Sequence, residues 1–231
     1  MIALIKEIKA YLNYPQLVHI PKKVDRPAML LFRLMLICLF AGISAGIIGG
    51  LLVNSGLIPP PGPSVLERNS YPEYMLLLGP IVLGPIFEEL VFRAQLRRFT
   101  GNILFICTIA GLLISAVIKS YWGFLISPIL FSILFLVYRI TIPGSIGRKF
   151  RFWNAVFPWH FHFTAVCFAL LHLQNFEKGI ALLPLGILYT LPQLAAGLVL
   201  GFTRMNYGLK YSIVLHALYN FLPALLLFSK Y

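Results

Sequence analysis

The sequence predicts an all-α fold, a polytopic membrane bundle of about seven transmembrane helices with a cytoplasmic N-terminus. Hydrophobic residues make up 59% of the 231 positions and charged residues only 11%, whereas an ordinary soluble domain has about 45–50% and roughly 25%. The mean hydropathy is +0.87. Apolar runs of about 20 residues, the length that crosses a bilayer core, recur along the chain. A water-soluble fold of this size could not bury so much apolar surface, so we expect an integral, multi-pass protein with the lipid bilayer as its partner.

The chain divides into a short basic N-terminal segment and a long apolar remainder. Residues 1–28 hold several lysines and arginines and predict an interfacial helix on the cytoplasmic side, with a solvated tail as the alternative. Residues 29–231 form the expected transmembrane bundle. Its seven predicted spans are Met29–Leu52, Tyr74–Leu96, Ile103–Ile118, Trp122–Ile142, Phe157–Leu173, Ile180–Phe202 and Leu209–Phe228.

Positive charges fall in every second loop of this scheme, which predicts the orientation of the bundle. They lie in segment 1–27 and at Arg97, Arg98, Arg148, Lys149, Arg151, Arg204 and Lys210, whereas the intervening loops hold few, among them Arg68, Lys119 and Lys178. The net charge of +12 then indicates contact with anionic lipid headgroups, and nothing indicates a nucleic-acid partner. Between the first two spans, Pro59–Pro63 predicts an extended loop. The three cysteines lie within apolar runs and are expected to be packing residues: Cys38, Cys107 and Cys167.

Two adjacent glutamates interrupt the second span. A charge in the middle of a span costs a few kcal/mol, so it usually serves a function and faces the bundle interior. Neighbouring residues on a helix point about 100° apart, and Glu88 and Glu89 therefore cannot share one role. Glu89 and Arg93 are four residues apart and can pair on one face, which leaves Glu88 directed elsewhere. A purely structural ion pair is the alternative, but it leaves the second glutamate without a local partner.

Further polar groups lie within the later spans. His172 follows Phe168 by four residues, and His216 and Asn220, also four apart, share one helix face. A lone histidine in a helix is more often a hydrogen-bonded packing residue, so it is the combination within one small bundle that indicates a site. Counting 1.5 Å per residue from the flanking charges puts Glu88 and His216 roughly 10–15 Å into the membrane. The same count puts His172 about 20 Å from the start of its span, which agrees less well.

These side chains suit the hydrolysis of an amide bond. A glutamate and a histidine in a dehydrated pocket can hold a water molecule and remove its proton. An imidazole and a carboxamide on another helix can stabilise the oxyanion that forms when this water attacks a carbonyl. In a metal-dependent version, Glu88, His172 and His216 bind a divalent metal such as zinc, and water fills the fourth position. The absence of a His-Glu-x-x-His helix favours the version that requires no cofactor, but the sequence does not separate the two.

Three motifs resemble, in their order along the chain, those of the CAAX prenyl endopeptidase and bacteriocin-processing family, also called abortive-infection or CPBP intramembrane proteases: Glu88-Glu89-x-x-x-Arg93, Phe168-x-x-x-His172 and His216-x-x-x-Asn220. The resemblance covers residues 74–228. It implies a glutamate-dependent intramembrane endopeptidase in which Glu88 and His172 activate the water. Glu89 and Arg93 would organise the first motif, and His216 with Asn220 would form the oxyanion hole. The implied substrate is a membrane-associated or lipidated peptide, and the implied location is the bacterial inner membrane.

One departure from the family pattern is the long segment between the first two motifs, which lie on consecutive helices in such proteins. The excess, about residues 102–142, contains two apolar runs and is expected to form an inserted helical hairpin. Two added spans keep the parity of the bundle, so the helix that carries His172 still runs antiparallel to the glutamate helix. The insertion therefore affects the surrounding packing more than the chemistry.

Functions of another class compete with hydrolysis. The same glutamates and histidines could form the proton relay of a transporter, although no paired repeats of the kind typical of transporters are visible. A non-catalytic immunity or chaperone-like protein could also retain the motifs without turnover. Gln193 and Asn206 either line the pocket or satisfy neighbouring helices, and His160 with His162 form either a second metal pair or part of an interfacial aromatic belt.

Overall fold

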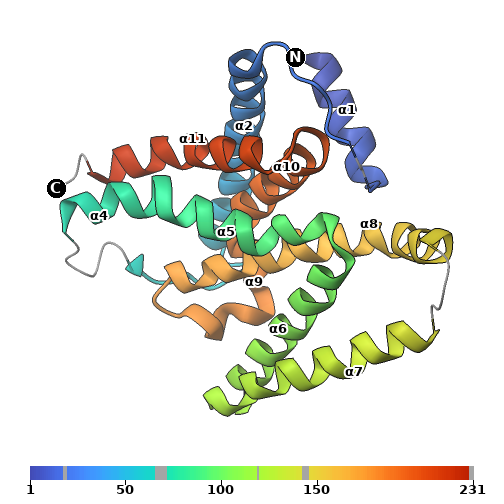
Figure 1. The fold of residues 1–231 in the computed structure, drawn as a ribbon. Helices are drawn as coiled ribbons and strands as arrows, with labels where there is room; N and C mark the ends of the chain where they lie inside the picture. Colours follow the sequence, from blue (N-terminus) through green and yellow to red (C-terminus); the bar gives the residue numbers. More distant parts are fainter. Residues whose placement is uncertain (18–19, 66–71, 119, 142–145, 229–231) are drawn as a thin grey trace.

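The computed structural model describes the chain except for residues 18–19, 66–71, 119, 142–145 and 229–231. Within the described residues the regular structure is helical, apart from one isolated bridge between Ser64 and Phe176, which confirms the all-α class. In chain order (Figure 1) the elements are α1 (Ile2–Asn13), α2 (Pro27–Asn54), α4 (Glu73–Leu78), the π-helical turn η1 (Gly79–Leu83), α5 (Gly84–Phe92), η2 (Ala94–Arg97), α6 (Phe99–Ile118), η3 (Tyr121–Leu125), α7 (Ile126–Thr141), α8 (Ile146–Leu171), η4 (His172–Asn175), η5 (Gly179–Leu185), α9 (Gly186–Tyr189), α10 (Leu191–Tyr207) and α11 (Leu209–Phe228).

Two helices of the described part are long and apolar enough to cross a membrane, Pro27–Asn54 and Gly147–Asn175. A third span results if Ala181–Tyr189 and Leu191–Tyr207, which meet at 62°, are counted together. Helices α6 and α7 are apolar but shorter. The count of seven spans and the cytoplasmic N-terminus therefore stay predictions, and two charges used for the orientation lie outside the described residues, Arg68 and Lys119.

Three predicted spans differ from the observed helices. Helix α8 begins at Ile146 rather than Phe157. The basic residues that precede the apolar run, Arg148, Lys149 and Arg151, are good helix formers and extend the helix toward the N-terminus. The run Ile180–Phe202 is broken at Thr190, where Pro192 starts a new helix but cannot continue the preceding one. The run Tyr74–Leu96 is divided by η1 into two α-helices and ends in a 3₁₀ turn.

Helix α10 lies at the centre of the core, with α2, α8 and α11 packed around it (Figure 1). Its small residues allow close approach of aromatic rings from α8. Gly201 faces the ring of Phe161, and Gly197 faces the ring of Phe168. The buried residues of α10 are Ala196, Gly197, Val199, Leu200, Gly201, Phe202, Thr203, Met205 and Asn206.

The N-terminal helix α1 is part of this core. Ile8 is buried in the same cluster as residues of α2, α10 and α11. The ring of Tyr11 makes edge contacts with Phe161 and Phe202, each with 5.5 Å between centroids. Residues 2–13 are therefore helical and packed on the core rather than solvated, and their location at the membrane interface stays a prediction.

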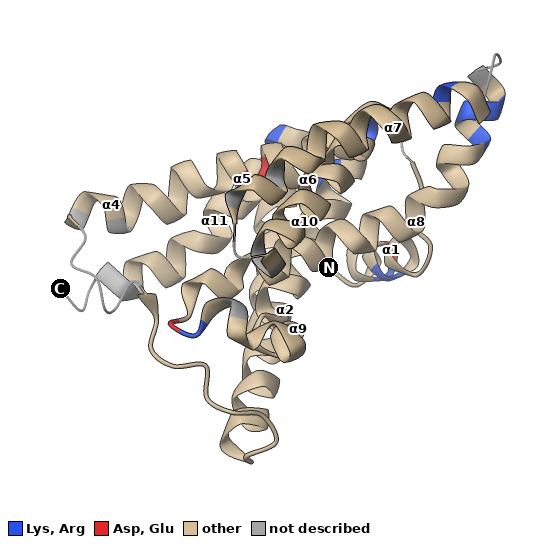
Figure 2. Cartoon of the chain, turned by 90° about the horizontal axis from the view of Figure 1, so that it is seen from below, with Lys and Arg blue, Asp and Glu red and all other residues tan. Residues whose placement is uncertain are grey.

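Helices α6 and α7 form a hairpin that stands apart from the other helices in Figure 1. Helix α7 packs on α6 and η3, while α6 joins the core through η2 and through Phe105, whose ring lies 5.6 Å from that of Phe92. Lys and Arg gather at the end where α7 leads toward α8 (Figure 2). The two helices cover the segment predicted as a hairpin and attach beside the remaining helices, and that this segment is an insertion stays a prediction.

Substitution of Gly201 by alanine tests the close packing of α8 on α10. The added Cβ would lie 2.7 Å from Cε2 of Phe161, a buried ring held by Tyr11. We expect Gly201→Ala to destabilise the protein by about 1–3 kcal/mol in thermal unfolding in detergent. Gly50→Ala is the control, because no atom lies within 4 Å of its added Cβ. Equal unfolding midpoints for the two variants would contradict the contact.

Candidate active site

The π-helical turn η1, which precedes the glutamates of α5, is hydrogen-bonded to α11. In the π-helical turn the N–H of Gly84 donates to the carbonyl of Gly79, so the next carbonyl, that of Pro80, would require an N–H from residue 85. Residue 85 is a proline and has none. The side chain of Asn220 supplies the missing donor, because its Nδ2 lies 2.9 Å from the Pro80 oxygen. Two prolines and one asparagine therefore fix the position of α11 beside η1.

The two adjacent glutamates of α5 have different environments. The side chain of Glu89 is 0% exposed and its Oε1 lies 3.4 Å from Nη1 of Arg93, the pairing that the helical spacing predicts. The side chain of Glu88 is 25% exposed and points to a cavity. Only one of the two carboxylates is therefore open to a substrate.

Helix α11 presents a row of polar groups to Glu89. His216 places Nδ1 3.1 Å from Glu89 Oε1, and the hydroxyl of Ser212 donates to Oε2. A carboxylate only accepts hydrogen bonds, so this contact assigns a proton to Nδ1 of His216. The Nε2 atom of the same ring then faces Glu88 Oε2 at 3.8 Å.

The guanidinium of Arg93 is enclosed between α5, α8 and α10. Its Cζ lies 3.8 Å from the ring centroid of Phe168, and Nη2 lies 3.4 Å from the carbonyl of Gly197. The Phe168 ring also makes edge contacts with the rings of His172 and His216, at 4.8 and 5.7 Å between centroids. Phe168 therefore connects the buried ion pair to both histidines.

His172 reaches the site from the end of α8. Its Nδ1 lies 2.8 Å from the carbonyl of Phe168, which only accepts, so Nδ1 carries a proton. Its Nε2 lies 3.7 Å from Glu88 Oε2. His172 and Glu88 therefore meet, although the depth count from the sequence agreed less well with such a contact.

A cavity of about 830 Å³ holds these groups, between α4, η1 and α5, the end of α8, α10 and α11. Its polar lining includes Glu88, His172, Asn175, Gln193, His216 and Asn220. Its apolar lining includes Met75, Leu78, Leu83, Phe168, Ala196, Pro223 and Ala224. The combination of one open carboxylate, two imidazoles and an apolar wall is suited to a water-mediated reaction on an amphipathic substrate.

Five of the seven predicted site residues line this cavity, Glu88, Phe168, His172, His216 and Asn220. Glu89 and Arg93 lie behind it. Ser212 was not among the predicted site residues. It lies four residues before His216, on the same helix face, and this spacing was the signal in the sequence that could have indicated it. Gln193 lines the cavity, whereas the side chain of Asn206 is buried and donates to the carbonyl of Phe202.

His160 and His162 do not belong to the site. His160 is buried with its Nε2 2.9 Å from Oε1 of Gln95, and its place in an interfacial aromatic belt stays a prediction. His162 Nε2 lies 3.1 Å from the carbonyl of Leu12. Both imidazoles therefore serve packing of α8, the first against η2 and the second against α1.

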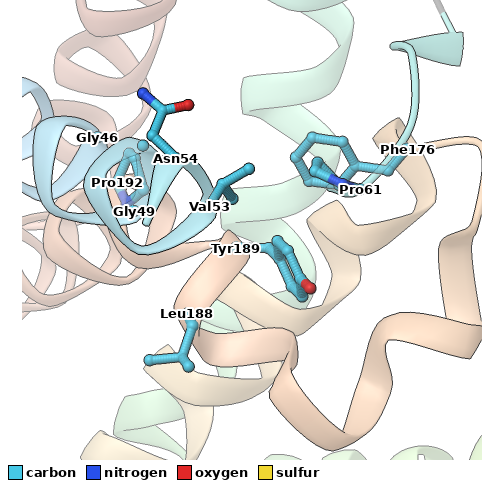
Figure 3. A pocket seen from close by; sticks show the side chains of 10 residues that line it. Gly46, Gly49, Val53, Asn54, Pro61, Phe176, Leu188, Tyr189 and Pro192 are labelled. Atoms are coloured by element: carbon cyan, nitrogen blue, oxygen red, sulfur yellow. The ribbon is translucent and has the colours of Figure 1, made fainter. Parts of the chain in front are cut away.

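A smaller hollow of about 250 Å³ lies on the other side of Pro192, which lines both spaces. Figure 3 shows it between the glycines of α2 and Tyr189, with Pro61 and Phe176 close by. The extended loop after α2 is fixed there, because the Tyr189 hydroxyl donates to the carbonyl of Pro59 at 2.7 Å. No carboxylate or imidazole lines this hollow, so it offers no chemistry of its own.

Within the described part of the chain, no group of three or more His, Cys, Asp and Glu side chains has an arrangement that could hold a metal ion. Glu88, His172 and His216 converge, but as placed they do not form a ligand set for zinc. We therefore derive no step through a metal.

Comparison with protein families matches residues 70–222 to the type II CAAX prenyl endopeptidases described as Rce1-like. The chain belongs to this Rce1-like family. The match extends from just before α4 to just after Asn220, so it includes all three motifs, and it confirms the resemblance to CPBP proteases. Comparison with curated proteins and with solved structures finds no match. Membership in the Rce1-like family implies intramembrane CAAX endopeptidase activity and agrees with the apolar helices of an integral membrane protein.

Loss of Arg93 tests the buried ion pair of the Rce1-like site. Arg93→Ala leaves the buried Glu89 carboxylate without its cation, and we expect a loss of about 3–5 kcal/mol in the free energy of unfolding. Replacing both partners, Glu89→Gln with Arg93→Met, should recover part of this loss. Lys22→Ala is the control, because Lys22 pairs with Glu7 at the exposed surface and should cost about 0–1 kcal/mol. Similar losses for Arg93→Ala and Lys22→Ala would refute the structural role of the buried pair.

Proposed function

We propose that this Rce1-like protein is an intramembrane endopeptidase that hydrolyses a peptide bond of a membrane-associated or lipidated peptide with a water molecule activated by Glu88 and His172. The observation that carries the proposal is the position of Glu88. Its free oxygen faces Nε2 of both His172 and His216 in the cavity, at 3.7 and 3.8 Å, while Glu89 is held in the ion pair. These distances exceed a direct hydrogen bond and allow one water molecule to contact the groups together.

Proton transfer follows from the fixed tautomer of His172. In the neutral ring Nδ1 carries the proton and donates a hydrogen bond to the Phe168 carbonyl, and Nε2 has a free lone pair. Glu88 and this lone pair are therefore proton acceptors beside the water, and neutral His216 also presents an Nε2 lone pair to Glu88. The water oxygen forms the new bond to the carbonyl carbon as its proton passes to Glu88, and the same proton then goes to the leaving amine when the C–N bond breaks.

The oxyanion is assigned mainly to Asn220. One N–H of its carboxamide donates to Pro80, and the second is available to a substrate oxygen in the cavity. His216 donates from Nε2 only as an imidazolium, because in the neutral ring the proton is on the Nδ1 that faces Glu89. Glu89, Ser212 and Arg93 act by orienting His216.

The apolar wall supports an amphipathic substrate. Residues of α4, η1 and α11 present hydrocarbon to the cavity, among them Met75, Leu78 and Leu83. A lipid chain or an apolar side chain buried there gains about 25 cal/mol per Å² removed from water or headgroups. The peptide bond beside this wall then lies within reach of Glu88.

The two glutamates have different expected phenotypes. Glu88→Gln removes the proton acceptor and should lower the cleavage rate of a farnesylated CAAX peptide by about 10²–10⁴-fold or more, with an unchanged unfolding midpoint. Glu89→Gln should lower both the rate and the midpoint, because Arg93 loses its partner. Peptide cleavage by the purified protein and thermal unfolding in detergent measure the two effects.

Asp25→Asn is the control for loss of a carboxylate, because Asp25 is exposed and lies outside the cavity. It should leave both measurements unchanged. Full cleavage by Glu88→Gln would refute the catalytic assignment. Binding of the peptide without cleavage by the unmodified protein would favour a non-catalytic partner instead.

Chelation tests the mechanism without a metal. Among the described side chains, no three His, Cys, Asp or Glu are arranged so that they could hold a metal ion. We therefore expect cleavage to persist after treatment with 1,10-phenanthroline and dialysis. Elemental analysis of the same sample reports bound zinc independently of activity. Loss of cleavage on chelation, restored by added zinc, would replace the proposed water activation by a metal-dependent one.

A further inference from the structure

The start of α10 has the sequence of a helix-capping motif, but the hydrogen bonds of that motif are not formed. Thr190-Leu-Pro-Gln193 has the form of a capping box, in which the side chain of the fourth residue accepts from the N–H of the first. In the structure the N–H of Thr190 donates to the carbonyls of Gly186 and Ile187, at 3.2 Å each. The Thr190 hydroxyl donates to Gly186 as well, at 3.0 Å. The bend between α9 and α10 therefore occupies the groups that Gln193 would otherwise cap.

The carboxamide of Gln193 is left in the cavity that contains Glu88. Its Oε1 atom is buried and has no hydrogen-bond partner among the described residues. A buried oxygen of this kind costs about 1–3 kcal/mol unless a donor reaches it. Such an unmet acceptor beside a reactive group is typical of a site completed by its ligand.

The position of Gln193 is fixed relative to the reacting groups. It lies one helical turn before Gly197, whose carbonyl faces the Arg93 guanidinium and whose Cα faces Phe168. Helix α10 is central in the core, and the Gln193 carboxamide and the Glu88 carboxylate line the same cavity from α10 and α5. A peptide bound to one is thereby placed against the other.

We infer that Gln193 is a substrate-binding residue whose Oε1 accepts a hydrogen bond from a backbone N–H of the peptide and sets which peptide bond faces Glu88. The ligand class rests on the proposed function. A peptide backbone fits because it supplies an N–H next to each carbonyl, and because the Nε2 group of the same carboxamide can donate to a neighbouring carbonyl. Side-chain identity plays no part in this contact.

Substitution of Gln193 by methionine tests the inference, since it keeps the length of the side chain and removes the acceptor. The probe is a fluorescent farnesylated CAAX peptide, whose affinity is measured in detergent on the Glu88→Gln background and whose cleavage is measured on the active protein. Gln193→Met should weaken binding about tenfold, the effect of one lost hydrogen bond, and raise KM more than it lowers kcat. Gln174→Met is the matched control, because Gln174 is exposed and does not line the cavity.

N-methylated versions of the peptide identify the bonded N–H. One methylated position should weaken binding to the protein with Gln193 about tenfold and add no further loss in Gln193→Met. Independent losses at every position would overturn the inference. So would a lower unfolding midpoint of Gln193→Met, because the Oε1 atom that is lost has no hydrogen-bond partner among the described residues. Coupling at one position without any cleavage by the unmodified protein would refute the proposed hydrolysis and leave the Gln193 contact in place.

Discussion

The buried ion pair between Glu89 and Arg93 is the interaction on which the remaining structure of the site depends. The pair belongs to α5 and its C-cap, yet its two charges contact α8, α10 and α11, through the Phe168 ring, the Gly197 carbonyl, and Ser212 with His216. Burial of the two charges is costly unless each is paired and hydrogen-bonded. The four helices are therefore held in one relative arrangement, and His216 is oriented as a consequence.

Adjacent glutamates can serve separate purposes only because they lie on a helix. A turn of about 100° per residue directs Glu89 into the core and Glu88 into the cavity. The buried carboxylate fixes the proton on one nitrogen of His216, and the exposed carboxylate meets the other nitrogen of that ring and of His172. One helix thus supplies both a buried carboxylate that supports the site and a carboxylate that faces the cavity.

Two irregular segments of the backbone, the turn η1 and the bend before α10, line the cavity. The π-helical turn leaves the Pro80 carbonyl to Asn220, and the bend before α10 leaves the Gln193 carboxamide without its capping role. In a bilayer such departures from regular hydrogen bonding are tolerated where the backbone lines a polar space or is buried in protein. Both breaks follow from prolines, at positions 85 and 192, and both deliver a carboxamide to the same cavity.

Composition and spacings of four residues act locally along one chain, so they were sufficient to predict the helical class, the membrane residence, the family and the pairing of Glu89 with Arg93. Contacts between helices became known from the folded structure alone. The meeting of His172 with Glu88 depends on how the end of α8 lies beside α5. The contact of Ser212 depends on the position of Glu89, and the free Gln193 oxygen depends on the carbonyls that Thr190 occupies. These are distances between segments far apart in the chain, and no local pattern contains them.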